Sequence, residues 1–311
     1  MAVISTLLYY TKTVLSFTLL SLCALYGVVA SVVLTCVGKR HLAQWTTARA
    51  FYYVMGTCLG IKIVVENAEN LNKMPAILVC NHQSVLDIMM LGRTFPQGCT
   101  VTAKSSLKWT PFLGWFMVLS GTLFLDRSNR EKSVRTLNNA LHDLRTKKRA
   151  IWVFPEGTRS HSTKVGLQPF KKGAFHLAQQ GHIPIIPVVV SNTSTIMNSK
   201  YKVFNRGVIT VKVLEPIPTD DLKKEEVTDF TNKVRDIMEK TVQELGYSQA
   251  IVDTTLPPEA RSIVTTVSEN EAGEESGDEQ EDVSSKDTVE EAVETLETEE
   301  TEGADTDAEH H

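Results

Sequence analysis

The sequence lacks several motifs that often reveal what a protein does. Its 311 residues include only five cysteines, and no two of these form a CxxC pair. The sequence therefore predicts free thiols, with neither a disulfide framework nor a metal site. It also lacks a GxSxG motif. This absence argues against a serine nucleophile carried on a strand-to-helix elbow.

Basic and aromatic residues are scarce at the C-terminal end. Residues 262–311 include 19 acidic residues, one basic residue and no Phe, Trp or Tyr. Such a segment cannot bury enough apolar surface to offset its ordering entropy, so we expect residues 251–311 to form a disordered acidic tail. The rest of the chain carries 31 basic and 18 acidic residues. This balance suits an anionic membrane surface or a phosphate-bearing substrate, and the absence of a basic-aromatic module argues against nucleic acid.

Charge is absent from Val14 to Val37, a run of 24 residues. A helix of that length rises about 36 Å, which is enough to cross a bilayer with some tilt. A cleaved signal peptide is the alternative, although its apolar region usually has only about 7–15 residues. Lys12 precedes the run, and Lys39, Arg40 and Arg49 follow it. The positive-inside rule then predicts that the C-terminal body faces the cytosol.

A second apolar segment, residues 41–60, contains several aromatic residues but also Arg49 and two glycines. We expect a helix that lies on the membrane or packs on the domain. The sequence thus divides into a membrane anchor at residues 1–60, a folded domain at residues 61–250 and the acidic tail at residues 251–311.

The folded domain alternates short runs of Val, Ile and Leu with longer mixed segments. This alternation predicts an α/β fold. An amphipathic helix at 221–245 is expected to close the domain. The expected strands are 61–66, 76–80, 99–103, 121–125, 150–154, 184–191 and 208–214, and the expected helices between them are 84–93, 131–146 and 172–180.

The first polar motif, Asn-His-Gln-Ser-Val-Leu-Asp, starts at Asn81, directly after an expected strand. On one continuous helix His82 and Asp87 would lie about 140° apart, so they meet only if His82 sits in the turn before the helix. Ser84 as N-cap, with Asp87 three residues later, favours that arrangement. His82 is then a candidate general base that Asp87 orients. The alternative is that Asp87 only caps the helix.

The second motif, Phe-Pro-Glu-Gly-Thr-Arg-Ser, starts at Phe154 and also follows an expected strand. Gly157 allows backbone amides to approach an anion closely, and Arg159 can hold a phosphate through two hydrogen bonds. A plain turn at the end of the strand is the alternative, because Pro and Gly are common in turns. Glu156 does not suit a phosphate site, and we expect it to orient an arginine or bind a substrate hydroxyl.

Together with the strand that ends at Arg127 and the apolar run at 183–188, these motifs resemble the glycerolipid acyltransferase family. The resemblance extends from about Leu78 to Val190 and includes the family's NHxxxxD and FPEGTRS signatures. It implies a mixed sheet flanked by helices. Within the family, the chain is most similar to enzymes that acylate 1-acyl-sn-glycerol 3-phosphate.

The resemblance implies a catalytic dyad of His82 and Asp87. It also implies a site for the acceptor's phosphate that consists of Lys104, Arg127, Glu156, Gly157, Thr158 and Arg159. The expected substrates are lysophosphatidic acid and acyl-CoA, with no cofactor. The expected location is the membrane of the endoplasmic reticulum or of a lipid droplet. The alternatives are another lysophospholipid or glycerol 3-phosphate as acceptor, or an inactive membrane scaffold.

The segment from Leu107 to Leu119 is rich in aromatic residues. It is expected either to dip into the bilayer and admit lipid, or to form a buried core helix.

Overall fold

The centre of the protein is an eight-stranded mixed sheet. The structure, a computed structural model, describes residues 2–126, 130–251, 256–257 and 262–263. The strand order is β1-β10-β7-β2-β5-β3-β4, with β11 paired to β10. The strands are β1 (Ile61–Glu66), β2 (Ala76–Cys80), β3 (Cys99–Lys104), β4 (Leu123–Leu125), β5 (Ala150–Val153), β7 (Ile185–Val190), β10 (Arg206–Val213) and β11 (Gln249–Ile251).

Four strands in the middle of the sheet run in the same direction. β2 pairs in parallel with both β5 and β7, and β3 pairs in parallel with β5. β4 continues this direction beside β3, whereas β10 is antiparallel to β7. Two short pairs lie outside the sheet: β6 (Lys164–Val165) with β12 (Ser262–Ile263), and β8 (Met197–Asn198) with β9 (Val203–Phe204).

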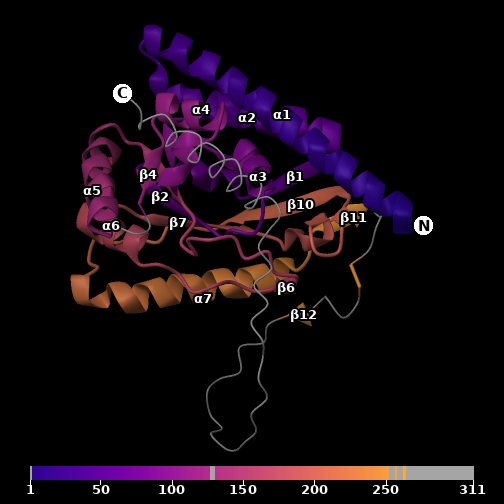
Figure 1. Cartoon of the computed structure of the whole chain (residues 1–311). Coiled ribbons are helices and arrows are strands. Elements are labelled where there is room, and N and C mark those ends of the chain that lie inside the picture. Colours follow the sequence, from indigo (N-terminus) through magenta and orange to yellow (C-terminus); the bar gives the residue numbers. More distant parts are fainter. Residues whose placement is uncertain (1, 127–129, 252–255, 258–261, 264–311) are drawn as a thin grey trace, which may run out of the picture. The chain divides into compact units, whose positions relative to one another are not determined.

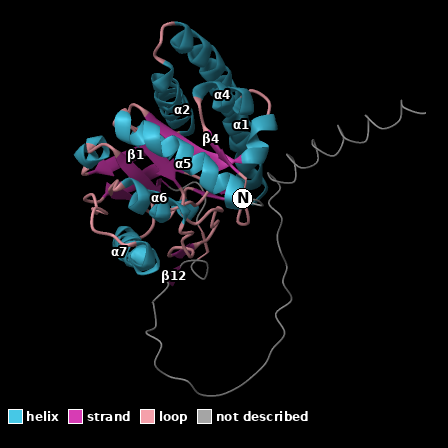
Figure 2. Ribbon diagram, turned by 90° about the vertical axis from the view of Figure 1, so that its left-hand side faces the viewer, coloured by secondary structure: helices cyan, strands magenta, loops and turns pink. Residues whose placement is uncertain are grey.

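Helices cover both faces of the sheet (Figures 1 and 2). Alternation along β2 supplies both cores, because Leu78 and Cys80 belong to one buried cluster while Ile77 and Val79 belong to the other. The first cluster includes side chains of α2 and α3, and the second includes side chains of α5, α6 and α7. These helices are α2 (Ala43–Leu59), α3 (Asp87–Thr94), α5 (Arg130–Thr146), α6 (Gly173–Gly181) and α7 (Val227–Leu245).

The N-terminal helix α1 (Ala2–Cys36) packs with one side against α2 and α4 (Leu113–Ser120). Gly27 permits the close approach, because a Cβ there would lie 2.6 Å from the ring of Phe116. The Lys12 ammonium donates to the Phe204 carbonyl, 2.7 Å away. The opposite side of α1 exposes apolar side chains, and Thr6–Cys36 is long and apolar enough to cross a membrane.

The prediction of a mixed α/β sheet with flanking helices is confirmed, and β1 and β2 have the expected limits. α1 begins at Ala2, twelve residues before the expected start. The helix can include Lys12 because the ammonium of this residue is hydrogen-bonded to a carbonyl outside the helix. The segment at 41–60 forms α2, which packs on the domain through Phe51, Met55 and Leu59.

Other helices and strands are shorter than predicted, because local backbone geometry moves their first residues. β4 begins at Leu123 rather than at 121, because Gly121 ends α4 with φ +86°. α7 begins at Val227 because the residues before it form the 3-10 turn η5 (Lys224–Glu226). The remaining 3-10 turns are η1 (Arg40–Leu42), η2 (Ala68–Asn72), η3 (Ser105–Trp109) and η4 (Thr193–Thr195).

Part of the expected tail at 251–311 is placed on the folded domain. Ile251 ends β11, Leu256 is buried, and residues 262–263 pair with β6. The other residues of that segment lie outside the described part of the chain.

Candidate active site

Both polar motifs lie at one edge of the sheet. Since β2, β3 and β5 are parallel, their carboxyl ends meet at the same edge, where open α/β sheets usually bind ligands. His82 follows β2 by two residues, and Glu156 follows β5 by three. The common direction of the strands and the pairing of β2 with β5 therefore bring residues that are far apart in sequence to the same place.

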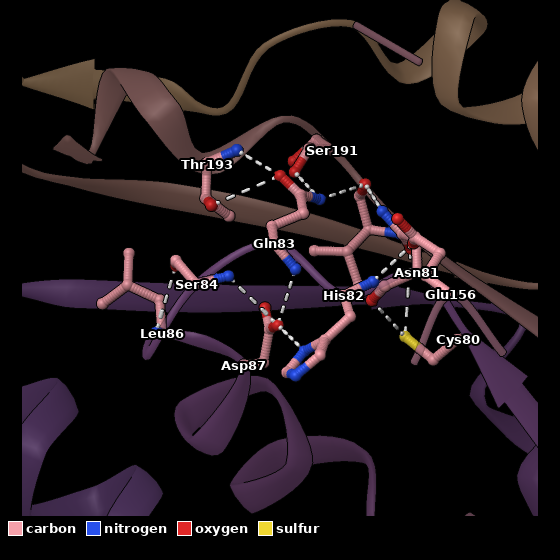
Figure 3. A network of polar contacts seen from close by, with 11 residues as sticks. Cys80, Asn81, His82, Gln83, Ser84, Leu86, Asp87, Glu156, Ser191 and Thr193 are labelled. Atoms are coloured by element: carbon pink, nitrogen blue, oxygen red, sulfur yellow. Dashed lines mark hydrogen bonds and ion pairs between the residues drawn. The ribbon is translucent and has the colours of Figure 1, made fainter. Parts of the chain in front are cut away.

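The structure brings His82 and Asp87 together. The imidazole Nδ1 lies 2.6 Å from Asp87 Oδ2 (Figure 3). His82 is in the turn before α3, and Asp87 is the first residue of that helix. The His82 side chain is 17% exposed and that of Asp87 is 4% exposed. When Nδ1–H donates to the carboxylate, the other ring nitrogen, Nε2, keeps its lone pair for a substrate proton.

The Asp87 carboxylate also holds the turn itself. Its Oδ2 accepts hydrogen bonds from the backbone N–H groups of Gln83 and Ser84, at 2.8 and 3.2 Å. The predicted start of the helix at Ser84 is therefore three residues too early, although Ser84 Oγ accepts from the N–H of Leu86. Asp87 both orients the imidazole and fixes the turn that carries it, so the two interpretations of this residue are compatible.

The second motif is bonded directly to the first. The N–H of Ser160 donates to the His82 carbonyl at 3.0 Å, and the N–H of His161 donates to the Gln83 carbonyl at 3.1 Å. The ring of Phe154 stacks on the His82 imidazole, with centroids 4.2 Å apart and planes 23° apart. The imidazole is therefore confined by a ring from one motif and a carboxylate from the other.

Glu156, the third residue of the second motif, is only 4% exposed. Its Oε1 accepts from the N–H of His82 at 2.8 Å, and its Oε2 accepts from the N–H of Gln168 at 3.3 Å. Burial raises the pKa of the Glu156 carboxyl to about 7, the two N–H donors oppose that rise, and the nearby Asp87 carboxylate adds to it.

Residues 157–160 of the second motif are closer to solvent. Gly157 has φ +76°, a left-handed conformation that favours glycine, and a Cβ there would lie 2.7 Å from Lys171 Nζ. Thr158 is exposed and Arg159 is partly exposed. Neither side chain has a hydrogen bond or ion pair with another residue in the described part of the chain. The guanidinium of Arg159 and the ammonium of Lys171 are thus available to an anion.

Another predicted residue, Lys104, lies at this edge without joining the dyad. Lys104 ends β3 and is exposed, with no hydrogen bond or ion pair to any residue that the structure describes. Arg127, which follows β4, lies outside the described residues.

Several residues of the site were not singled out by the sequence analysis. The side-chain NH2 of Asn81 donates to the Val190 carbonyl, and its Oδ1 accepts from the Val190 N–H. Gln83 donates to the carbonyls of Val190 and Ser191 and accepts from the N–H of Thr193. These amides join the turn that carries His82 to the end of β7 (Figure 3). Their position directly after a buried strand was the available signal.

The polar groups at this edge are suited to proton transfer. All five cysteines are free thiols, as predicted. Within the described ranges, no group of three or more His, Cys, Asp and Glu side chains has metal-binding geometry. The arrangement can remove a proton from a hydroxyl at Nε2 of His82 and hold an anionic group near Arg159.

Comparisons with known proteins agree on one family. A family model described as Acyltransferase matches residues 62–191, which include the described site residues. The 1-acyl-sn-glycerol-3-phosphate acyltransferase of Saccharomyces cerevisiae is 59% identical over 260 residues, which cover 84% of this chain and 86% of the yeast protein. The human 1-acyl-sn-glycerol-3-phosphate acyltransferase alpha is 32% identical, over 71% of this chain and 78% of the human protein.

A solved structure extends the similarity to the fold. The crystal structure of PlsC, the 1-acyl-sn-glycerophosphate acyltransferase from Thermotoga maritima, matches with a TM-score of 0.60 and 26% sequence identity. The match covers 78% of this chain and 95% of the bacterial protein.

Proposed function

The chain belongs to the glycerolipid acyltransferase family, among the 1-acyl-sn-glycerol-3-phosphate acyltransferases, and from this premise we propose the reaction it performs. The protein transfers a fatty acyl group from acyl-CoA to the sn-2 hydroxyl of lysophosphatidic acid. The products are phosphatidic acid, a precursor in phospholipid biosynthesis, and coenzyme A.

One observation carries this proposal: the two signature motifs form a single site. His82 is bonded through its ring to Asp87 and through its main chain to Glu156 and Ser160. A base and a partly exposed arginine therefore lie at the same sheet edge, as an acceptor with both a hydroxyl and a phosphate requires.

The mechanism follows from the free nitrogen of the His82 ring. Nε2 takes the proton of the sn-2 hydroxyl while that oxygen attacks the thioester carbonyl. The tetrahedral intermediate then collapses, the carbon–sulfur bond breaks, and the coenzyme A thiolate takes a proton from the imidazolium. Asp87 stabilises the imidazolium that forms between these steps. No nucleophile from the protein is required, because the acceptor supplies it.

Arg159 is the main candidate for the acceptor's phosphate, supported by Lys104, Gly157 and Thr158. A planar guanidinium can hold a phosphate through two parallel hydrogen bonds. Arg159→Ala is expected to raise KM for lysophosphatidic acid by about 10- to 100-fold, as loss of a charge-assisted pair does. KM for acyl-CoA should stay within about twofold, since no thioester contact is lost.

Initial rates measured while each substrate is varied in turn give the KM values for lysophosphatidic acid and acyl-CoA separately. Lys62→Ala is the matched control, because Lys62 is an exposed cation on β1, away from the site. An equal rise in KM for both substrates in Arg159→Ala would contradict a specific role in phosphate binding.

We further propose that the exposed side of α1 attaches the protein to the bilayer, with the domain on the cytosolic side. Positive charges after the apolar run support this orientation. The endoplasmic reticulum is the proposed location. The segment after Lys104 adds to the apolar surface, because Trp109 is 80% exposed and Trp115 is 54% exposed. Phe116 and Met117 of the same segment are buried, so α4 has one face in the core and one outside.

The exposed aromatic residues of the segment that follows β3 are expected to help long-chain acceptors leave the bilayer. The double variant Trp109→Ser/Trp115→Ser should raise KM for long-chain lysophosphatidic acid in vesicles by about tenfold. With a short-chain, water-soluble acceptor, KM should be unchanged. Ile251→Ser, which alters an exposed apolar residue on β11, is the control. A similar rise for both acceptors would indicate damage to the site rather than loss of a membrane contact.

An acceptor panel tests the proposed function. Purified protein in vesicles receives labelled oleoyl-CoA with lysophosphatidic acid, lysophosphatidylcholine or glycerol 3-phosphate. We expect phosphatidic acid to form fastest by a wide margin. Faster transfer to either other acceptor would establish the alternative substrate. Absence of transfer to all three would favour an inactive scaffold.

A further inference from the structure

Glu156 is more deeply buried than the residues that follow it in the second motif. Thr158 is exposed and Arg159 is partly exposed, whereas Glu156 is 4% exposed. Family resemblance groups all three with the acceptor's phosphate. A buried carboxylate is poorly suited to that task, since it would repel a phosphate and has little surface for a ligand to touch.

Both oxygens of Glu156 are already engaged with the main chain. Oε1 accepts from the N–H of His82, and Oε2 accepts from the N–H of Gln168 (Figure 3 shows the contact with His82). The His82 carbonyl in turn accepts from the N–H of Ser160. Residue 82 is therefore held on both of its main-chain polar groups by the segment that follows β5, while Asp87 holds its ring.

We propose that Glu156 is a positioning residue that fixes the main chain of His82 at the dyad and does not touch the acceptor. This inference rests on the proposed function and assigns Glu156 a different part in it. Orienting the backbone of the base sets the direction of Nε2, and a base misplaced by about 1 Å loses much of its effectiveness.

Glutamine at position 156 gives a shape-preserving test. Its amide keeps one accepting oxygen and replaces the other with a donor. One of the two N–H groups, of His82 or of Gln168, must then face a donor instead of an acceptor. Glu156→Gln is expected to lower kcat by about 10- to 100-fold, with KM for lysophosphatidic acid within about twofold, because only the approach to the transition state is impaired.

Glu239 provides a matched control. It is 5% exposed, lies on α7 and accepts from the N–H of Leu167 at 2.9 Å, one residue before the partner of Glu156. Glu239→Gln therefore perturbs the same loop from a buried carboxylate that has no hydrogen bond to His82. Its kcat should stay within about threefold of wild type, even if both variants unfold at lower temperature.

The pH profile supplies a readout that a purely structural role would not change. Groups facing the Glu156 carboxyl are Asp87 on α3 and Arg235 on α7, with His82 and Cys80 at the end of β2. Its pKa of about 7 means that the charged form, which accepts both N–H groups, predominates only above that pH. Wild-type kcat should therefore fall as pH drops through about 7, and this component should be absent from Glu156→Gln.

Proton NMR separates failure of this inference from failure of the proposed function. The His82 Nδ1–H in its bond to Asp87 should give a low-field resonance that His82→Ala lacks. The resonance should shift or broaden in Glu156→Gln and persist in Glu239→Gln, whether or not acyl transfer is detected. A raised KM for lysophosphatidic acid with unchanged kcat and an unchanged resonance in Glu156→Gln would overturn the positioning role. Wild-type protein without acyl transfer would overturn the proposed function instead.

Discussion

Replacing His82 with alanine is expected to lower kcat by about 10²- to 10⁴-fold, the range usually lost with a general base. The ring is partly exposed and its Nε2 is the nitrogen opposite the bond to Asp87. Binding of acyl-CoA and vesicles should be unchanged, because the proposed role of His82 is limited to the proton of the acceptor hydroxyl. Rapid-quench measurement of phosphatidic acid formation separates the chemical step from product release.

His142→Ala is the control for loss of an imidazole. His142 is exposed on α5, within a helix rather than at the carboxyl end of a central strand. We expect its kcat to equal that of wild type. Near-wild-type turnover by His82→Ala, with the thermal unfolding curve intact, would rule out His82 as the base.

Replacing Asp87 with asparagine is expected to have the second large effect, a fall in kcat of about 10²- to 10⁴-fold. The carboxylate Oδ2 now accepts from Nδ1 of His82 and from the backbone N–H groups of Gln83 and Ser84. A neutral amide stabilises the imidazolium less, and its NH2 group has to avoid these three donors. The imidazole tautomer and the turn are therefore both disturbed.

Two measurements divide these consequences. The change in Tm reports how much the turn stabilises the fold, and the pre-steady-state rate constant for acyl transfer reports the chemical step. A variant with lowered Tm but wild-type kcat would show that Asp87 serves only as a cap for α3. KM for lysophosphatidic acid should change little, because the Asp87 carboxylate is buried and bonded to the imidazole and the turn.

Much of the fold was predictable from hydrophobic pattern. The limits of β1 and β2 agree with the sequence because buried strands with Val and Ile are bounded by Gly, Pro or Asn. Limits set by single residues were not predictable, since they depend on tertiary contacts. Lys12 inside α1 is one example, because its charge is accommodated by a carbonyl of β9, 192 residues away.

The site was partly predictable for the same reason. The pairing of His82 with Asp87 follows from a short turn and a helix start, which local spacing encodes. The contact between Glu156 and His82 joins residues 74 positions apart and depends on the pairing of β2 with β5. No local pattern distinguishes a glutamate that contacts a substrate from one that contacts a backbone amide. Only the register of the sheet does so.

The most direct test of the central claim is the kcat of the double variant His82→Ala/Asp87→Asn beside both single variants. Groups that act as one unit give strongly non-additive losses. If Asp87 acts through the imidazole, the double variant should be as slow as His82→Ala alone, within about threefold. Losses that instead multiply, so that the double variant is slower by the product of the two single effects, would contradict the dyad.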